Sequence, residues 1–436
     1  MSSNPKPTVE SDKNPYADPL ASATTSIISH LGTFDVENYG DLLYPIIFRR
    51  LLQQRYAGPR ILQYALLPGE APQEVGFENY AVRSLFAAER AEPVKLVVGG
   101  GDILRTDWNL VAMHYGRKSR MSYGGLRRSI GLTGRLGYWL RRYLPPLKVN
   151  TFYANRFRTR WMNYPAAGPF LINPQDLPRG SVVSYVSCGV PHDFAPSESE
   201  TVKRTLDQSL SVYLRDEQSA EKLRQAGVHR KIHIAPDLAV ILSDQFRYAD
   251  EARKGRQILS RFGVKTDGPI LCFQSQPYPG FLVEDIARQL KRYRERAGSD
   301  VVLVPTGYCH GDHEFLQSLS KQSGGAFKYA DVHSVYDVIS VIAACDIFVG
   351  TSLHGNITAF SFGIPHLFGP LPVDKAAGFL RVTNLPLELK LGSWSEINDR
   401  IDMAVGMGRS FFSERAQTAK ARVYKVIDEV LAELLK

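Results

Sequence analysis

Residues 346–362 read DIFVGTSLHGNITAFSF and decide the fold that we expect for the whole chain. They open with a short apolar run, 346–350, which is typical of a buried β-strand, and they close with 357–362, which continues as a helix. Small and polar residues fill the turn between the two. A strand that passes through such a turn into a helix is the building unit of a parallel sheet with crossover helices, so this stretch predicts an α/β protein.

The same unit recurs upstream, in two sets separated by a charged stretch without strand character at 244–266. The apolar runs cover residues 26–31, 60–66, 95–98, 181–187, 211–214 and 232–235 in the first set, and 269–273 and 301–305 in the second. Two sets predict two Rossmann-like domains with parallel sheets that face each other across a cleft. In such sheets the ligand binds at the carboxyl ends of the strands.

The expected organisation follows from these patterns. A flexible leader, 1–23, precedes an N-terminal Rossmann-like domain at 24–243, and a second such domain follows at 244–395. The C-terminal segment, 396–436, is expected to be helical, with a charged amphipathic helix that packs back on either domain. The first domain also holds a basic insertion, 108–175.

The formal net charge of +9 is concentrated in that insertion. Residues 108–175 contain twelve Lys and Arg and no Asp or Glu, whereas the rest of the chain has 41 Lys and Arg against 44 acids. The segment is either a solvated basic face or a surface for phosphate-rich partners, and its interleaved aromatic residues favour an anionic membrane surface or a basic cover over the cleft. Nucleic acid is not expected as a partner, because no RNA- or DNA-binding module is recognisable.

Composition and cysteine usage bound the class of protein. Hydrophobic content of 44% and charged content of 22% argue against a disordered or membrane-embedded chain. Four widely spaced cysteines indicate a reducing compartment, and neither a signal peptide nor a run of about 18 apolar residues occurs. We therefore expect a cytoplasmic protein, and the basic insertion adds the hypothesis of a peripheral position on the inner face of the cytoplasmic membrane.

The turn within the opening stretch is also the strongest candidate for a functional site. The hydroxyls of Thr351 and Ser352, the free N–H groups of the helix start and the His354 imidazole come together there. This combination suits holding a phosphate and moving a proton near neutral pH. A lone histidine is more often structural, but the small polar neighbours on both sides favour a functional His354.

Three other polar turns follow predicted strands. Asn38 and Gly40 precede a helix, where Gly40 lets the backbone approach a ligand or Asn38 simply caps the helix. Residues 99–102, GGGD, leave bare N–H groups that can line a phosphate or a sugar, although a lone glycine run is a weak signal. Arg215 ends another strand and can either fork onto a carboxylate or phosphate or form an interdomain ion pair.

A metal interpretation arises at one place only. Residues 309–314, CHGDHE, have two histidines at H-x-x-H spacing, which is compatible with metal ligands on a turn. No second cluster with ligand spacing is evident in the sequence, so we expect no metal site. These polar residues are instead expected to follow a strand end and to line the cleft.

Taken in order, the short motifs resemble the polysaccharide pyruvyl transferase family. The resemblance covers roughly Thr25 to Leu371, and the order and spacing of the motifs carry it, the Leu-His-Gly block most of all. The motifs are Asn38-Tyr39-Gly40-Asp41, Gly99-Gly100-Gly101-Asp102, Ser187-Cys188-Gly189-Val190, Arg215-Asp216 with Ser219 and Leu223, Pro236-Asp237, and Ser352-Leu353-His354-Gly355 with Ala359, Gly363 and Pro365.

The resemblance implies a GT-B-like architecture, with the acceptor on the N-terminal domain and the donor on the C-terminal domain. Members of the family transfer the enolpyruvyl carbons of phosphoenolpyruvate onto two hydroxyls of a sugar, which gives a cyclic pyruvate ketal and phosphate. An Arg and a His of an Arg-Leu-His block handle the donor there. The His corresponds to His354, but the Arg position holds Ser352, so Arg215 or Lys375 must supply the cation. No metal or organic cofactor is implied.

The chemistry of that reaction suggests roles for the candidate residues. A cationic pocket must hold phosphate and carboxylate, an acid must protonate the methylene carbon, and a base must accept a hydroxyl proton. We hypothesise that His354 is the acid or contacts the phosphate, that Arg215 grips the donor, and that Asp41 or Asp102 serves the acceptor. The further substrate-binding candidates are Asn38, Gly40, Gly99, Gly100, Gly101, Thr351, Ser352, Leu353, Gly355 and Lys375.

The expected acceptor is a sugar of an exopolysaccharide or of its lipid-linked precursor. Two other functions stay open. One is a GT-B glycosyltransferase that uses a nucleotide sugar, against which no Glu-rich ribose-binding stretch is evident near the end of the second domain. The other is a non-catalytic glycan- or lipid-binding relative that has lost its activity together with the missing Arg.

Overall fold

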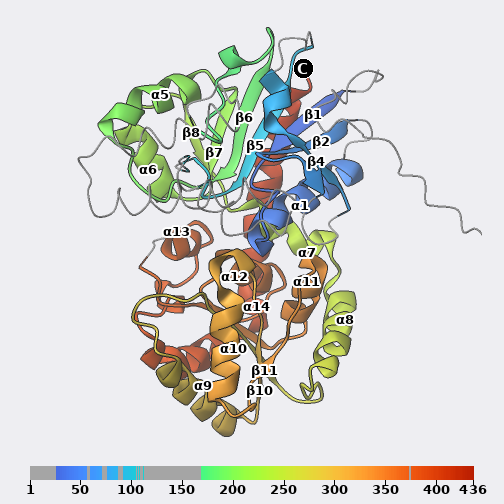
Figure 1. The fold of residues 1–436 in the computed structure, drawn as a ribbon, viewed down its shortest axis with the longest axis vertical. Coiled ribbons are helices and arrows are strands. Elements are labelled where there is room, and N and C mark those ends of the chain that lie inside the picture. The colour runs from blue at the N-terminus through green and yellow to red at the C-terminus, as the bar shows by residue number, and fades with distance from the viewer. Residues whose placement is uncertain are drawn as a thin grey trace, which may run out of the picture.

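A computed structural model describes residues 26–55, 59–70, 76–86, 92–104, 106, 108, 111, 168–372 and 375–436. Its frame is two β-sheets, which occupy the upper and lower halves of the molecule in Figure 1. The first sheet holds β1 (Ile27–Leu31), β2 (Arg60–Ala65), β3 (Gly69–Glu70), β4 (Glu78–Ala81), β5 (Lys95–Gly101), β6 (Val182–Cys188), β7 (Ser211–Leu214) and β8 (Ile232–Ile234). The second holds β9 (Ile270–Gln274), β10 (Asp300–Leu303), β11 (Lys328–Tyr329), β12 (Ile347–Gly350) and β13 (His366–Phe368).

Both sheets have the strand order of open α/β folds. The first runs β3-β4-β2-β1-β5-β6-β7-β8, and each of its neighbouring pairs is parallel except β3 with β4. The second runs β11-β10-β9-β12-β13 and is parallel throughout. The central strands are buried on both faces, which is why they read as continuous apolar runs rather than as alternating patterns.

Helices connect and cover the strands. They are α1 (Tyr39–Arg55), α5 (Pro196–Asp207), α6 (Glu217–Gln225), α7 (Leu242–Gln245), α8 (Tyr248–Arg261), α9 (Val283–Ala297), α10 (Asp312–Gln322), α11 (Val335–Ala343), α12 (Leu353–Ser361), α13 (Lys375–Val382) and α14 (Ile397–Leu434). Short 3-10 turns add η1 (Val82–Phe86), η3 (Pro174–Asp176), η4 (Leu238–Ile241), η5 (Tyr308–His310), η6 (Leu387–Leu389) and η7 (Trp394–Glu396). The helix α9 shows the usual logic, because its buried residues recur at helical spacing and Gly298 ends it in a left-handed conformation.

The two halves are joined where α1 meets α12. Helix α1 belongs to the first half in sequence, yet its apolar side packs into the same buried core as the second half. The Tyr39 hydroxyl lies 2.6 Å from the Thr358 hydroxyl, and the Tyr39 N–H donates to the Thr306 carbonyl. This contact joins the start of α1 directly to the second half.

Helix α14 packs against both halves. In Figure 1 it runs from the lower half to the upper half, and its core-facing residues join the second half's core. Near its end Asp428 pairs with Arg55, and Glu429 accepts a hydrogen bond from Tyr213. The helix bends at Gly408, whose φ of 76° is outside the helical range. The expected C-terminal helix is therefore confirmed, and it spans Ile397–Leu434.

The α/β class with two Rossmann-like parallel sheets is likewise confirmed. The leader, 1–23, and most of the basic insertion, 109–110 and 112–167, lie outside the described residues, so the expectations about them stay predictions. The domain boundaries stay predictions as well. Within the described ranges, no helix combines the length and apolarity needed to cross a bilayer.

Candidate functional site

A cavity of about 250 Å³ lies between the carboxyl ends of the two sheets. Pockets that hold drug-sized ligands measure about 300–1,000 Å³, so this one suits a small, compact ligand. The wall draws on turns that follow strands of both sheets, as expected for an open α/β fold. Ten of the sequence-predicted site residues line it: Asn38, Asp41, Gly101, Asp102, Arg215, Thr351, Ser352, Leu353, His354 and Lys375.

His354 lies in the first turn of α12 and reaches across to the first half. Its Nε2 atom is 3.3 Å from the Tyr44 hydroxyl and 3.6 Å from Oδ2 of Asp237. Its Nδ1 side faces Gly40, where an added Cβ would lie only 2.1 Å from Nδ1. The histidine is therefore clamped between α1 and the turn that precedes η4, with 11% of its side chain exposed.

Arg215 holds the centre of a buried charge network in the first half. Its guanidinium pairs with Asp102 through Nη2, and its Nη1 lies 3.4 Å from Oδ2 of Asp237. The Tyr44 hydroxyl donates to the same Oδ2 atom. Arg215 and Asp237 are 4% and 1% exposed, so the pairing takes place out of water, where charges interact strongly. The sequence left two interpretations for Arg215, and the structure shows ion pairing within the first half, at the edge of the cavity.

The network sets the protonation of its acids. Burial alone would raise the pKa of Asp237, but the hydrogen bond and charge of His354 and the charge of Arg215 outweigh burial and lower this pKa to about 2. Burial likewise opposes ionisation of Asp102, and the charges of Arg215, Lys375 and His354 lower its pKa below the ordinary value. Both carboxylates are therefore ionised near neutral pH.

The start of η4 and a strained residue of β6 hold Asp237 in place. The Asp237 carboxylate caps η4 by accepting from the Ala239 N–H, at 2.9 Å. The N–H of Leu238, which lies between Asp237 and Ala239, donates to the Ser187 hydroxyl at 2.8 Å. Ser187 has a φ of 55°, which is rare for a residue other than glycine. Such strain persists only where the surroundings enforce it, and it is common at functional sites.

Glycines near the cavity make room for the network rather than for a ligand. A Cβ on Gly189 would lie 2.3 Å from Oδ1 of Asp102 and 2.9 Å from Nε of Arg215. Among the predicted glycines, Gly40 faces the His354 ring, Gly99 faces the Val186 carbonyl, Gly100 faces the Tyr44 ring and Gly355 faces the Phe348 ring. Those four do not line the cavity, and only Gly101 does so directly.

The start of α1 brings two predicted residues together. Asn38 donates from its amide to Oδ2 of Asp41 at 2.8 Å, while its carbonyl oxygen accepts from the Gly40 N–H at 3.3 Å. Asn38 thus orders the helix start, as the capping interpretation requires, and also positions Asp41. Both side chains line the cavity.

The turn before α12 is held by its own side chains. The Ser352 hydroxyl accepts from the Gly355 N–H at 3.1 Å and so caps α12. The Thr351 hydroxyl accepts from the Gln276 N–H at 3.1 Å and lies 3.3 Å from Oε1 of Gln274. These hydroxyls therefore shape the turn, and they line the cavity in the same position.

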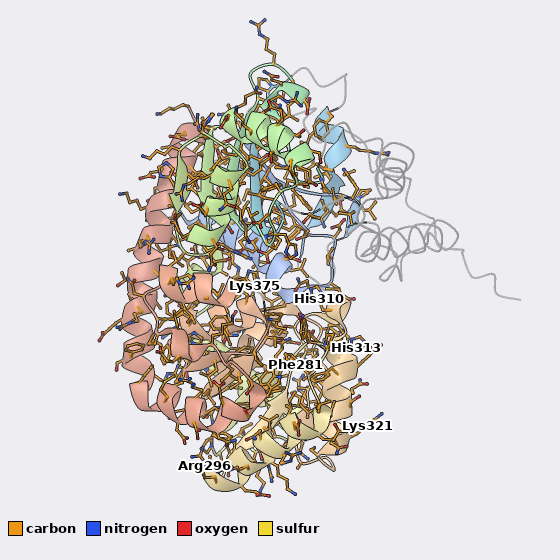
Figure 2. The ribbon with its side chains drawn as sticks, turned by 90° about the vertical axis from the view of Figure 1, so that its left-hand side faces the viewer. Phe281, Arg296, His310, His313, Lys321 and Lys375 are labelled. Carbon is orange, nitrogen blue, oxygen red and sulfur yellow. The ribbon has the colours of Figure 1, made fainter. Side chains whose placement is uncertain are left out.

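Lys375 begins α13 and lines the cavity from the second half. Its positive charge helps to lower the pKa of Asp102 across the cavity. In Figure 2, Lys375 and His310 are labelled at the height where the two halves meet, and both residues line the cavity. Among the described residues, no hydrogen bond or ion pair occupies the Lys375 ammonium group.

Several residues in the cavity wall or in the network behind it escape the sequence analysis. Tyr44 lies in an apolar helix and looks like core, and Asp237 occurs in a resemblance motif without a role. Gln274 is the one polar residue at the end of the buried run ILCFQ, and that position was a usable signal. Asp312 lies within CHGDHE, which attracts a metal interpretation, although no group of His, Cys, Asp and Glu among the described residues is arranged to hold a metal ion.

Two facing Rossmann-like halves, with clustered cations and carboxylates where the strands end, define a GT-B-like transferase scaffold. The model of the family called polysaccharide pyruvyl transferase matches residues 38–368. The chain therefore belongs to the polysaccharide pyruvyl transferase family, and the resemblance seen in its motifs is confirmed. Among curated proteins, none is similar enough in sequence to count as a match.

Solved structures are similar in fold at low sequence identity. Anabaena Alr3699/HepE in complex with UDP and glucose has 13% identity and a TM-score of 0.45, over 94% of this chain and 99% of that one. UDP-GlcNAc 2-epimerase from Neisseria meningitidis bound to UDP-GlcNAc has 12% identity and a TM-score of 0.45, over 92% and 100%. An α,α-trehalose 6-phosphate synthase from Burkholderia multivorans has 13% identity and a TM-score of 0.46, over 94% and 96%.

Proposed function

We propose that the protein transfers the enolpyruvyl carbons of phosphoenolpyruvate onto two hydroxyls of a sugar, forming a pyruvate ketal and releasing phosphate. The observation that carries the proposal is the small cavity where His354, Arg215 and Lys375 meet Asp41 and Asp102. A donor with a phosphate and a carboxylate needs cations, and an acceptor sugar needs hydrogen-bond acceptors. Membership of the family supports the reaction class.

The cationic residues of the cavity differ in whether their charge is already paired within the protein. Arg215 already shares its charge between Asp102 and Asp237, so it contributes mainly to the field of the cavity. Lys375 carries no such pairing among the described residues and therefore takes the role of the cation that Ser352 does not supply. His354 handles the donor either as a phosphate contact or as an acid.

The carboxylates serve the acceptor side. Asp102 is held ionised beside Arg215, so it acts as a hydrogen-bond acceptor for a sugar hydroxyl. Asp41 lines the same wall, positioned by Asn38. Proximity of both sugar hydroxyls to the central donor carbon then replaces two encounters in solution with one bound geometry, which is the main source of rate that such a site offers.

The acceptor is proposed to be a sugar of an exopolysaccharide or its lipid-linked precursor. The basic insertion, 108–175, is proposed to meet an anionic membrane surface and so to bring the protein to the inner face of the cytoplasmic membrane. This proposal rests on composition. Reversing Arg127, Arg128, Arg141 and Arg142 to Glu should abolish sedimentation with anionic liposomes, and unchanged sedimentation would leave the insertion as a solvated basic face.

The function is tested by incubating the protein with phosphoenolpyruvate or with nucleotide sugars, each with a panel of glycans. We expect phosphate release only with phosphoenolpyruvate and acceptor together, and an acceptor mass raised by pyruvic acid less one water. His354→Ala should lower the rate by about 100-fold or more, whereas the exposed His229→Ala should not. Nucleotide release would favour a glycosyltransferase, and binding without turnover would favour a non-catalytic relative.

A further inference from the structure

A second buried acid, Asp312, lies in the wall of the same cavity without a role in the network described above. It is the first residue of α10 and follows Gly311, which has a φ of 85° and ends η5. Only 1% of Asp312 is exposed, and the residue lines the cavity from the second half. Buried acids normally have their oxygens satisfied, so the partners of this one decide what it can do.

The two carboxyl oxygens of Asp312 have very different hydrogen-bonding surroundings. Oδ2 accepts from the Gln274 amide at 2.7 Å, from the Gly307 N–H at 2.9 Å, and from the Thr306 N–H and hydroxyl at 3.2 and 3.4 Å. Oδ1 is buried and has no hydrogen-bond partner among the described residues. Because donors crowd Oδ2, a proton held by this carboxyl can sit only on Oδ1.

The donors around Asp312 are neutral. Its immediate partners carry no charge. His310 and Asp312 both lie beside Gly307, where an added Cβ would be 3.0 Å from Cδ2 of His310 and 3.5 Å from Oδ2 of Asp312. The other titratable groups are His313 and Glu314 on its own helix, and Cys309, Asp41, Asp102, Arg215, His354 and Lys375 around the cavity. Burial without a paired cation raises the pKa of Asp312 to about 6.

Gln274 ties Asp312 to the catalytic turn. Its amide nitrogen donates to Asp312, while its carbonyl oxygen accepts from the Ser352 N–H at 2.7 Å. The acid is therefore held at a fixed distance from the turn that presents His354. The His354 nitrogens face Gly40 on one side and Tyr44 and Asp237 on the other, so the histidine is oriented by the first half.

We propose that Asp312 is the acid that protonates the methylene carbon of phosphoenolpyruvate, with its proton carried on Oδ1. This inference rests on the proposed function. It assigns the proton transfer to Asp312 rather than to His354. The division follows the geometry, since the unpartnered oxygen belongs to Asp312 and the histidine is already paired with an ionised carboxylate.

The reaction begins with proton transfer from Asp312. The C=C π electrons of phosphoenolpyruvate take the Oδ1 proton, so a methyl group forms and positive charge develops at the central carbon. The two sugar oxygens bond to that carbon in turn, and the C–O bond to phosphate breaks with its electrons leaving on phosphate. Of the two hydroxyl protons, one restores Asp312 and the other leaves with the phosphate.

Asp312→Asn is the decisive variant, because the amide keeps the size of the side chain and can still accept the donors at Oδ2, but it cannot give up a proton. We expect kcat to fall by about 100-fold or more while KM for phosphoenolpyruvate changes less than about threefold. Asp331→Asn, which alters a half-exposed acid outside the cavity, is the matched control and should keep normal kcat.

Turnover of Asp312→Asn within about threefold of the unaltered protein would overturn the inference, and so would a rise in KM with unchanged kcat, which would make Asp312 a binding residue only. Circular dichroism and phosphoenolpyruvate binding by calorimetry show whether the variant is folded and competent. If the unaltered protein releases no phosphate from phosphoenolpyruvate with any acceptor, the proposed function itself fails. If it does and Asp312→Asn does too, only this inference fails.

Discussion

Two buried aspartates, Asp237 in the charge network beside the cavity and Asp312 in the cavity wall, show how the same burial gives opposite chemistry. Asp237 and Asp312 are each 1% exposed. Asp237 meets Arg215, His354 and Tyr44, and its pKa is lowered to about 2. Asp312 meets only neutral donors, and its pKa is raised to about 6. Burial disfavours the ionised form of both, so the partners decide which acid stays charged and which can hold a proton.

The contrast separates the tasks of the two halves. The first half supplies a fixed, ionised framework that orients His354 and that we propose to serve the acceptor. The second half supplies an acid that titrates near the range where enzymes work. Environments that push two acids apart in pKa are a common way to assign acid and base roles within one site.

The largest expected effect comes from removing the shared cation. Arg215→Met leaves Asp102 and Asp237 without their buried partner. Breaking a buried pair in this way costs about 3–5 kcal/mol of unfolding free energy, which urea denaturation measures. Arg224→Met removes an exposed pair with Glu217 and should change the free energy by about 0–1 kcal/mol. Equal losses in the two variants would show that the first half does not depend on its charge network.

The second largest effect expected is a change in how the free energy of unfolding depends on pH when Asp312 is replaced. Its ordinary pKa of 3.8 is raised to about 6 in the folded chain, so the folded state keeps a proton that the unfolded state has released between these values. The unaltered protein therefore loses stability as pH rises through that window. Asp312→Asn removes the titration, so its stability relative to the unaltered protein should grow by up to about 3 kcal/mol from pH 4 to pH 7.

Unfolding in urea at several pH values measures this difference. A variant that loses turnover and gains stability at neutral pH is the pattern of a residue kept for function. A difference that does not depend on pH would mean that Asp312 titrates like an exposed acid, and the contrast with Asp237 would be lost.

The third effect tests how closely the two halves fit together at Gly40. A Cβ there would lie 2.1 Å from Nδ1 of His354, so Gly40→Ala must displace the imidazole. A misplacement of about 1 Å at a reacting group can lower a rate by about 100-fold, and steady-state phosphate release should show a loss of that order. Gly268→Ala meets open space and should leave the rate unchanged. Normal activity in Gly40→Ala would remove His354 from the reaction.

The smallest expected effect is at Tyr44. Tyr44→Phe removes the hydroxyl that donates to Asp237 and approaches His354, while the ring still packs. We expect a loss of about 1–2 kcal/mol in unfolding free energy, because a charged acceptor loses a buried donor. Tyr424→Phe removes a hydrogen bond to the partly exposed Asp244 and should change less. A neutral Tyr44→Phe would indicate that the other partners of Asp237 hold it without the tyrosine.

The fold was predictable from the chain because buried parallel strands are short apolar runs with polar turns at their ends. All nine predicted runs correspond to strands. The strands that escape prediction are β3, β4, β11 and β13, which are short and include polar residues such as Glu78 and His366. Pairing with a neighbouring strand, rather than local apolarity, makes these segments extended, and a single sequence does not show such pairing.

The site was predictable in part for the same reason. Residues at strand ends, such as Asp102, Arg215 and His354, converge because parallel strands end at one edge. The partners of each group were not predictable, since pairing of Arg215 with Asp237 or of Gln274 with Asp312 depends on how distant turns pack. The roles of the glycines were not predictable either, because Gly40 and Gly189 leave room for side chains that are distant in the sequence.

The most direct test of the account is the fate of the methylene carbon. With phosphoenolpyruvate and acceptor in deuterated water, NMR of the product should show a ketal methyl group that carries one deuterium, since an acid in exchange with solvent delivers one proton to that carbon. A product that keeps the unlabelled methylene as a vinyl ether, or an acceptor that gains no pyruvate-derived unit, would contradict it.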